Sequence, residues 1–229
     1  MAAVPEHEVA RLNALRDYRV LDTAAEAAYD DLTQLAAFVC DTPIALVSLI
    51  DVDRQWFKSK VGITASETPR DMAFCAHTIL DQIPLIVEDT SKDVRFAANP
   101  LVTGDPLIRF YAGAPLITPE GHALGTLCAI DRVPRRLTLA QTVALSALAR
   151  QVVAQLELRR VSASLAGALK NVRTLSAMLP MCAWCRKVRD DAGFWSLVED
   201  YLSQHGGPKM THGICPACLK SEFPVRPVG

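Results

Sequence analysis

Two pairs of cysteines near the C-terminal end are the residues of this sequence best suited to chemistry. Cys182 and Cys185 form one C-x-x-C pair, and Cys215 and Cys218 form the other. Each pair folds into a turn whose two thiolates point at one centre, and two such turns supply the four soft ligands of a tetrahedral zinc ion. We therefore predict one zinc ion per chain, with a structural role because four thiolates leave no open coordination position.

The sequence is also compatible with alternatives to this four-cysteine site. His205 or His212 is a candidate to replace one of the cysteines, since imidazole is also a zinc ligand. A redox-active C-x-x-C pair is a further alternative, although no β-α-β pattern surrounds the first pair. The 29 residues between the pairs, residues 186–214, include an amphipathic stretch at 194–203, which predicts a helix that brings the two pairs together.

Composition limits the functions open to the chain. Its 229 residues are 50% hydrophobic and carry 24 Lys and Arg against 25 Asp and Glu, as in a globular protein. With no basic excess, nucleic acid and anionic membranes are not expected as partners. Residues 1–8 lack the features of a signal peptide, and no apolar run reaches membrane-spanning length. We expect a cytoplasmic protein, in which seven cysteines favour metal binding over disulfides.

The elements that must position these residues follow from hydrophobic periodicity. Apolar spacing predicts two helices, a hairpin, several small elements and a second hairpin within the first 137 residues. Thr23 and Glu26 have the spacing of a capping box at the start of the second helix. This order predicts an α+β fold, an antiparallel sheet flanked by helices. The expected helices are 6–19, 24–40 and 72–80, and the expected strands are 44–51, 55–61, 85–88, 108–117 and 124–130.

A single helical pattern then runs from residue 138 to 179, where Pro180 ends it. Seven of its small or apolar residues alternate at steps of three and four, which is the a/d pattern of a coiled coil. We predict a parallel dimeric stalk, hence a homodimer; a helix folded back on its own domain is the alternative. The predicted domains are therefore 1–137, 138–179 and 180–229. The seven residues are Leu158, Val161, Leu165, Ala168, Val172, Leu175 and Leu179.

Four ordered motifs give the first domain a resemblance to a known family. They are RQWFKS (54–59), FCAHTI (74–79), RFYAGAPL (109–116) and GTLCAID (125–131). Over about residues 8–160 the chain resembles bacterial GAF domains. The resemblance implies a sensory domain of a signalling protein, with a small-molecule pocket between the sheet and short helices. A bilin is not expected, because Cys75 and His77 are two residues apart rather than adjacent.

The last fifty residues resemble a small Cys-rich module found at the C-termini of bacterial receiver, PAS and GAF proteins. They leave no room for a kinase or a cyclase, so we expect another kind of output. Beside the first cysteine pair, Trp184, Arg186, Lys187 and Arg189 form a basic and aromatic cluster. We expect this surface to bind a downstream signalling protein rather than DNA.

Six residues come from the segments that would line the GAF pocket, and they combine large rings with a few polar groups, as ligand sites do. Ordinary core packing is the alternative for the aromatic residues, and hydrogen bonding rather than metal or haem ligation for the histidine. The two cysteines, together with Cys40, are expected to be isolated, inert thiols. The six residues are Trp56, Phe74, Cys75, His77, Tyr111 and Cys128.

Charged residues in the loops around this pocket have two interpretations. They could bind an anionic ligand through bidentate contacts, or they could fix the loops through salt bridges. Asn99-Pro100 and Gly104-Asp105-Pro106 mark a long loop that is a candidate lid. The charged residues are Arg70, Arg95, Arg109, Asp51, Asp53, Asp89 and Asp93.

The sequence thus predicts a signalling adaptor whose GAF domain senses a small molecule or dimerises, and whose helix relays to the zinc module. The absence of a recognisable nucleophile-and-base pair predicts that it is not an enzyme. One alternative is a thiol-dependent redox enzyme or sensor, since some GAF domains reduce methionine sulfoxide with pocket cysteines. Another is a zinc-dependent transcription regulator.

Overall fold

The computed structural model describes residues 3–176, 180–190, 192–204 and 213–222. The chain forms two compact units, Met1–Leu165 and Ala166–Gly229.

The first unit is built on a six-stranded sheet in which every neighbouring pair of strands is antiparallel. The strand order is β3-β2-β1-β6-β5-β4. Sequence periodicity did not predict β3, because three residues are too few to show an alternation. The strands are β1 (Ile44–Ile50), β2 (Arg54–Val61), β3 (Glu67–Pro69), β4 (Leu85–Val87), β5 (Phe110–Ile117) and β6 (Ala123–Asp131).

The burial of strand β1 on both faces of the sheet explains why its sequence is continuously apolar. All seven of its residues are buried. Ala45, Val47 and Leu49 point into one hydrophobic core, whereas Ile44 and Leu46 point into another on the opposite face of the sheet. A strand covered on both faces has no solvent side on which polar residues would alternate.

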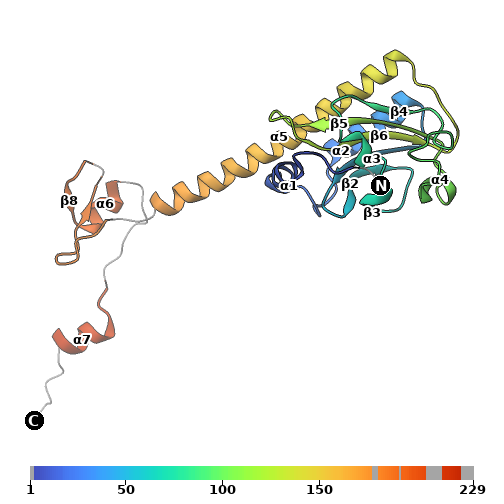
Figure 1. Cartoon of the computed structure of the whole chain (residues 1–229). Coiled ribbons are helices and arrows are strands. Elements are labelled where there is room, and N and C mark those ends of the chain that lie inside the picture. The colour runs from blue at the N-terminus through green and yellow to red at the C-terminus, as the bar shows by residue number, and fades with distance from the viewer. Residues whose placement is uncertain (1–2, 177–179, 191, 205–212, 223–229) are drawn as a thin grey trace, which may run out of the picture. The chain divides into compact units, whose positions relative to one another are not determined.

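Three helices cover the first face of the sheet (Figure 1). They are α1 (Glu8–Asp17), α2 (Ala27–Cys40) and the first half of α5 (Leu139–Ser176). Leu145, Val152 and Leu156 of α5 are buried in this core. The compact unit therefore extends well beyond the predicted boundary at residue 137, because the long helix begins as part of the sheet domain.

The other face is covered by short elements and loops. These are η1 (Arg70–Met72), α3 (Cys75–Thr78) and α4 (Pro100–Thr103). The predicted helix 72–80 is thus shorter, and the predicted long loop contains α4. Phe74 stacks on Phe96, with 4.3 Å between the ring centroids, and on Tyr111 at 5.2 Å. These rings form the second core beneath the loops.

The predicted capping box is wrong. Glu26 is the N-cap of α2, but its side chain makes no capping hydrogen bond. Instead, the ammonium group of the fully buried Lys58 side chain donates to Thr23 Oγ1 at 2.8 Å and to Glu26 Oε1 at 2.6 Å. An ammonium group that is buried without acceptors costs more free energy than a helix N-terminus that water can solvate. The side chains of Thr23 and Glu26 therefore accept hydrogen bonds from Lys58 instead of capping the helix.

The second unit contains four short elements among its described residues, after the end of α5. They are β7 (Val188–Arg189), β8 (Trp195–Ser196), α6 (Val198–Gln204) and α7 (Pro216–Glu222). The predicted helix over 194–203 is wrong in its first half, where Trp195 pairs with Arg189 in a small hairpin. His205, His212 and Leu179 lie outside the described residues.

None of the helices within the described ranges combines the length and apolarity that a bilayer-spanning segment requires.

Gly125 allows β6 to approach β1, and this close approach is testable. A Cβ atom at Gly125 would lie 1.9 Å from the Ser48 carbonyl oxygen and 2.8 Å from the Leu49 Cα. Both are backbone atoms that cannot move aside without shifting the sheet. We expect Gly125→Ala to lower the free energy of unfolding by about 3 kcal/mol in urea denaturation.

Gly167→Ala is the matched control, because beyond its chain neighbours and the backbone of its own helix no atom of the described residues lies within 4 Å of the added Cβ. It should leave stability unchanged or raise it by less than about 1 kcal/mol. Equal unfolding midpoints for Gly125→Ala and the unsubstituted protein would contradict the close approach.

Candidate functional site

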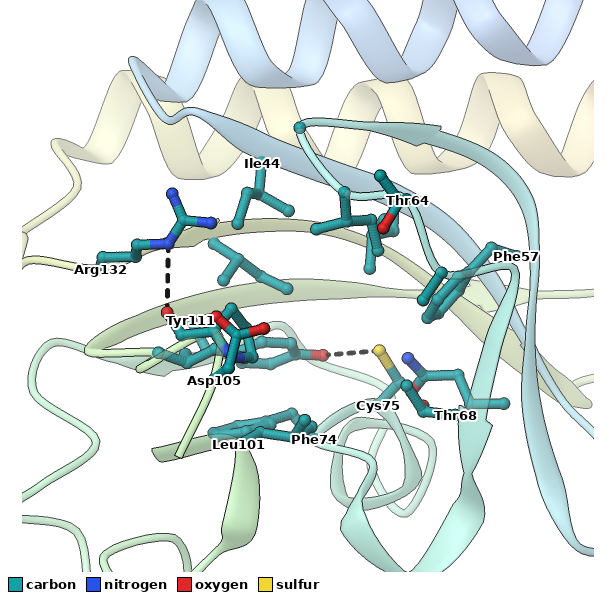
Figure 2. A pocket seen from close by; sticks show the side chains of 18 residues that line it. Ile44, Phe57, Thr64, Thr68, Phe74, Cys75, Leu101, Asp105, Tyr111 and Arg132 are labelled. Carbon is teal, nitrogen blue, oxygen red and sulfur yellow. Dashed lines mark hydrogen bonds between the residues drawn. The ribbon is translucent and has the colours of Figure 1, made fainter. Parts of the chain in front are cut away.

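A cavity of about 550 Å³ lies on the loop-covered face of the sheet. Figure 2 shows its walls, with Ile44 and Phe57 on strands, Phe74 and Leu101 on the covering segments, and the Cys75 thiol facing Tyr111. Its volume is within the range of small-molecule sites. The lining residues are Ile44, Leu46, Gln55, Phe57, Gly62, Ile63, Thr64, Ala65, Thr68, Phe74, Cys75, Leu101, Asp105, Pro106, Ile108, Tyr111, Ile130 and Arg132.

Two buried polar atoms of this wall have no hydrogen-bond partner among the described residues. They are Gln55 Oε1 and Thr68 Oγ1, and Gln55 is only 5% exposed. A buried acceptor without a partner costs about 1–3 kcal/mol. The cavity therefore offers an unused acceptor at Gln55 and an unused hydroxyl group at Thr68.

The Cys75 thiol stands at the centre of a buried hydrogen-bond network. Thr126 Oγ1 donates to Cys75 Sγ at 2.8 Å, Ser48 Oγ lies 3.1 Å from the sulfur, and the Tyr111 hydroxyl lies 3.4 Å from it. Thr78 bonds the Tyr111 hydroxyl at 2.7 Å. Gly113 makes room for this hydroxyl, because a Cβ there would lie 2.1 Å from it.

This network changes how Cys75 titrates. Burial acts to raise the pKa of Cys75, but hydrogen bonds from the Cys128 thiol and the three hydroxyl groups outweigh it and lower the pKa to about 7. The pKa of Cys128 is raised well above its usual value by its bond to Cys75 and by burial. When the pair loses a proton, the negative charge therefore rests on Cys75 and Cys128 stays protonated.

The structure brings together some of the six residues predicted for the pocket. Phe74, Cys75 and Tyr111 line the cavity, and Cys128 lies behind Cys75 with 3.9 Å between the two sulfurs. Trp56 does not line it, because β2 turns Phe57 to the cavity and Trp56 into the core beneath the helices.

His77 does not line the cavity either. Its ring meets the Phe96 ring edge-on, with 4.8 Å between centroids. Burial, with a smaller contribution from Arg95, lowers the pKa of His77, which favours the neutral imidazole.

The predicted ring of charged residues mostly fixes the loops. Arg70 pairs with Glu8 at 2.6 Å, Arg95 pairs with Asp93 at 2.6 Å, and Arg109 donates to two backbone carbonyls. Two charged residues do line the cavity. Asp105 was predicted only as part of the candidate lid, and Arg132 was not predicted for the pocket.

Gln55 was missed as well, although a signal for it exists. In an alternating strand, residues two apart share a face, so Gln55 had to lie on the same face as Phe57. The only signal for Asp105 was its place in the candidate lid, because it follows α4 in an irregular segment without periodicity. The candidate lid does contribute to the cavity, through Leu101, Asp105 and Pro106.

Each cysteine pair of the second unit has the local geometry of half a metal site. The backbone N–H of Cys185 donates to Cys182 Sγ at 3.5 Å, and that of Cys218 donates to Cys215 Sγ at 3.4 Å. These N–H groups lower the pKa of both acceptor thiols. Arg186 has a φ of 60°, which turns the chain tightly after the first pair.

Among the described residues, no group of three or more His, Cys, Asp or Glu side chains is close enough to hold a metal ion. The structure thus places the cysteines as two pairs. The donor chemistry of each pair fits zinc, whereas a joined four-cysteine site stays a prediction.

Comparison with known proteins identifies the first unit. The model of the family described as GAF domain matches residues 24–156. A Pseudomonas aeruginosa protein named cyclic di-GMP phosphodiesterase is 42% identical over 157 residues. The match covers 68% of this chain but only 27% of that relative, so the chain spans about a quarter of the length of the curated relative it matches.

Solved structures share the fold at low sequence identity. The GAF domain of an Acinetobacter phosphoenolpyruvate-protein phosphotransferase has a TM-score of 0.51 at 15% identity, covering 68% of this chain and 96% of that one. The GAF domain of Thermosynechococcus elongatus PixJ has a TM-score of 0.52 at 16% identity, covering 70% and 96%. The predicted GAF-type α+β fold is confirmed.

The prediction that the chain is not an enzyme is corrected by the same comparison. Its Pseudomonas aeruginosa relative is named as a phosphodiesterase. The lack of a recognisable nucleophile-and-base pair in the sequence is therefore no ground for excluding catalysis.

Proposed function

The chain belongs to the GAF domain family, and we propose that its cavity is the sensory site of a bacterial system that controls cyclic di-GMP. The name of the Pseudomonas aeruginosa relative supports the link to cyclic di-GMP. The observation that carries the sensory role is the cavity, in which the Gln55 Oε1 atom has no hydrogen-bond partner within the part of the chain that the structure describes.

The chemistry of the cavity walls favours a small, mostly apolar ligand with a hydrogen-bond donor. Its lining is dominated by aliphatic and aromatic side chains. A donor on the ligand would satisfy Gln55 Oε1. Cyclic di-GMP itself fits poorly, because its two phosphates call for several cations, whereas Arg132 is the cationic lining residue and Asp105 stands in the same wall.

The signal would travel by population shift. A ligand that prefers one packing of α3, α4 and the loops over the sheet would bias that packing. Helix α5 begins in the same domain and continues without a break to Ser176. A change in its rotation or register would then be presented to a downstream protein by the Cys-rich segment, where the Trp184 side chain is 95% exposed.

Indole is a suitable probe of the cavity, because it joins an apolar ring system to a single N–H donor. We expect the protein to bind indole at least tenfold more tightly than 1-methylindole, which lacks the donor, when titrated by calorimetry. Gln55→Leu should remove this preference, since it deletes the acceptor. A preference that survives in Gln55→Leu would contradict the role of Gln55.

A second pair of variants locates the binding. Ala65 is exposed and lines the cavity, so it lies at the opening, and Ala65→Trp should weaken indole binding at least tenfold. Val94→Trp is the control, because Val94 is 98% exposed and outside the cavity wall. Equal indole affinities in the two variants would place the binding elsewhere.

We further propose that the four cysteines bind one structural zinc ion per chain. Native mass spectrometry under reducing conditions should then find one zinc ion per chain, retained in Cys40→Ser and lost in Cys182→Ser and in Cys215→Ser. A metal-free chain with four freely alkylated C-terminal thiols after addition of equimolar zinc would refute this proposal.

The protein is also proposed to be a homodimer paired through α5. Leu158, Val161 and Leu165 have a/d spacing and are 57–61% exposed, so pairing would bury them. Light scattering should find a dimer that Leu158→Glu with Leu165→Glu converts to a monomer. Ala163→Glu, at the position furthest from the seam, should leave the dimer intact, and a monomeric unsubstituted protein would exclude the pairing.

A further inference from the structure

Cys75 and Cys128 are not the isolated thiols that the sequence predicts. Cys75 lies at the start of α3 and Cys128 within β6, and their sulfurs are 3.9 Å apart. Both side chains are buried. The fold has thus brought together two cysteines that are 53 residues apart in the sequence.

The surroundings of the two sulfurs differ. Cys75 Sγ has the hydroxyl groups of Ser48, Thr126 and Tyr111 within 2.8–3.4 Å. A sulfur that accepts several hydroxyl donors is stabilised as a thiolate. Because Cys128 keeps its proton, the pair consists of a nucleophile and a neighbouring thiol.

The two thiols also differ in their access to the cavity, and Cys75 is again the one placed to react first. Both thiols are shielded from bulk solvent, but Cys75 lines the cavity whereas Cys128 is absent from the lining. Figure 2 shows the Cys75 sulfur at the cavity wall, facing the Tyr111 hydroxyl. A small molecule in the cavity would therefore meet Cys75 first.

We propose that Cys75 and Cys128 form an oxidation site for a small hydroperoxide that enters the cavity. The Cys75 thiolate attacks one peroxide oxygen, the O–O bond breaks, and Cys75 becomes a sulfenic acid. The leaving hydroxide or alkoxide takes up the proton that Cys75 released on ionising and departs as water or an alcohol. The Cys128 thiol then attacks the Cys75 sulfur and loses its proton, the S–O bond breaks, and water leaves as the disulfide forms. Two thiols are oxidised and one hydroperoxide is reduced.

Formation of the disulfide requires only a small movement of the two cysteines. The sulfurs must approach by about 2 Å to reach bonding distance. This movement would join α3 to β6 and alter the cavity wall at Cys75. A dithiol reductant would restore the thiols by exchange.

Peptide mapping of the full chain tests the proposal directly. Trypsin cleaves after Arg70 and Lys92 and after Arg109 and Arg132, so the two cysteines fall in separate peptides. After brief exposure of the reduced protein to hydrogen peroxide, we expect a cross-link between peptides 71–92 and 110–132 within one chain. Dithiothreitol should reverse it.

Buried Cys40 provides the internal comparison, since burial raises its pKa to about 11. Cys75 should oxidise at least tenfold faster than Cys40, with a rate that rises as the pH increases through about 7, where Cys75 loses its proton. Tyr111→Phe removes one hydroxyl donor and should shift this rise to higher pH. Cys40→Ser should leave the cross-link unchanged.

The order of reaction is tested by single substitutions at the pair. In Cys128→Ser, dimedone should trap a sulfenic acid on Cys75, and no cross-link should form. In Cys75→Ser, Cys128 should stay reduced. Melting temperatures establish that each variant is folded. If a variant does not fold, the peptide mapping of the unsubstituted protein still tests the proposal.

The proposal is overturned if Cys75 oxidises no faster than Cys40, or if the two peptides do not cross-link. It does not rest on the proposed function, because the oxidation assay contains no indole or other organic ligand. If indole does not bind but the cross-link forms, the proposed function fails and the oxidation site stands. If indole binds but no cross-link forms, the oxidation site fails and the proposed function stands.

Discussion

The pairing of β1 with β6 at the centre of the sheet is the contact on which the rest of the first unit depends. Residues Leu46 and Ser48 face Cys128 and Thr126 across this pair. The pairing puts the second thiol and two of the hydroxyl groups of the thiol network on one side of the sheet. Gly125 lets the two backbones approach, so that no side chain separates them.

The two faces of this strand pair are covered differently, and that difference creates the site. Long helices cover one face and fill it with a continuous core. The other face is covered by short elements and loops, which leave a cavity of about 550 Å³. Since short elements bury less apolar area than long helices do, this cover is the part of the domain best able to change its packing when a ligand binds.

Much of the fold could be predicted from the sequence, because the longer helices and strands carry a clear hydrophobic pattern that matches the faces they bury. The apolar run of β1 and the long pattern of α5 both correspond to elements of the structure. The strand β3 and the helix α4 could not be predicted, since three or four residues carry no usable period. The capping box failed because the buried Lys58 ammonium group uses its side chains.

The site was harder to predict than the fold, because its residues are joined by tertiary packing. The family motifs drew attention to Phe74, Cys75 and Tyr111, all of which line the cavity. They also selected Trp56, which the alternation of β2 turns to the opposite face. Cys75 and Cys128 were both predicted for the pocket, but the close approach of their sulfurs had no signal in the sequence, since α3 and β6 meet only in the folded domain.

Hydrogen exchange of the full chain, followed by mass spectrometry, tests most directly whether a rigid strand pair supports a separately moving cover. Amides of β1 and β6 should exchange only through global unfolding, whereas those of α3, α4 and the connecting loops should exchange through smaller openings at lower free energy. Exchange of β1 and β6 at the same free energy as α4 would contradict the account, because the cover could then not move without the sheet.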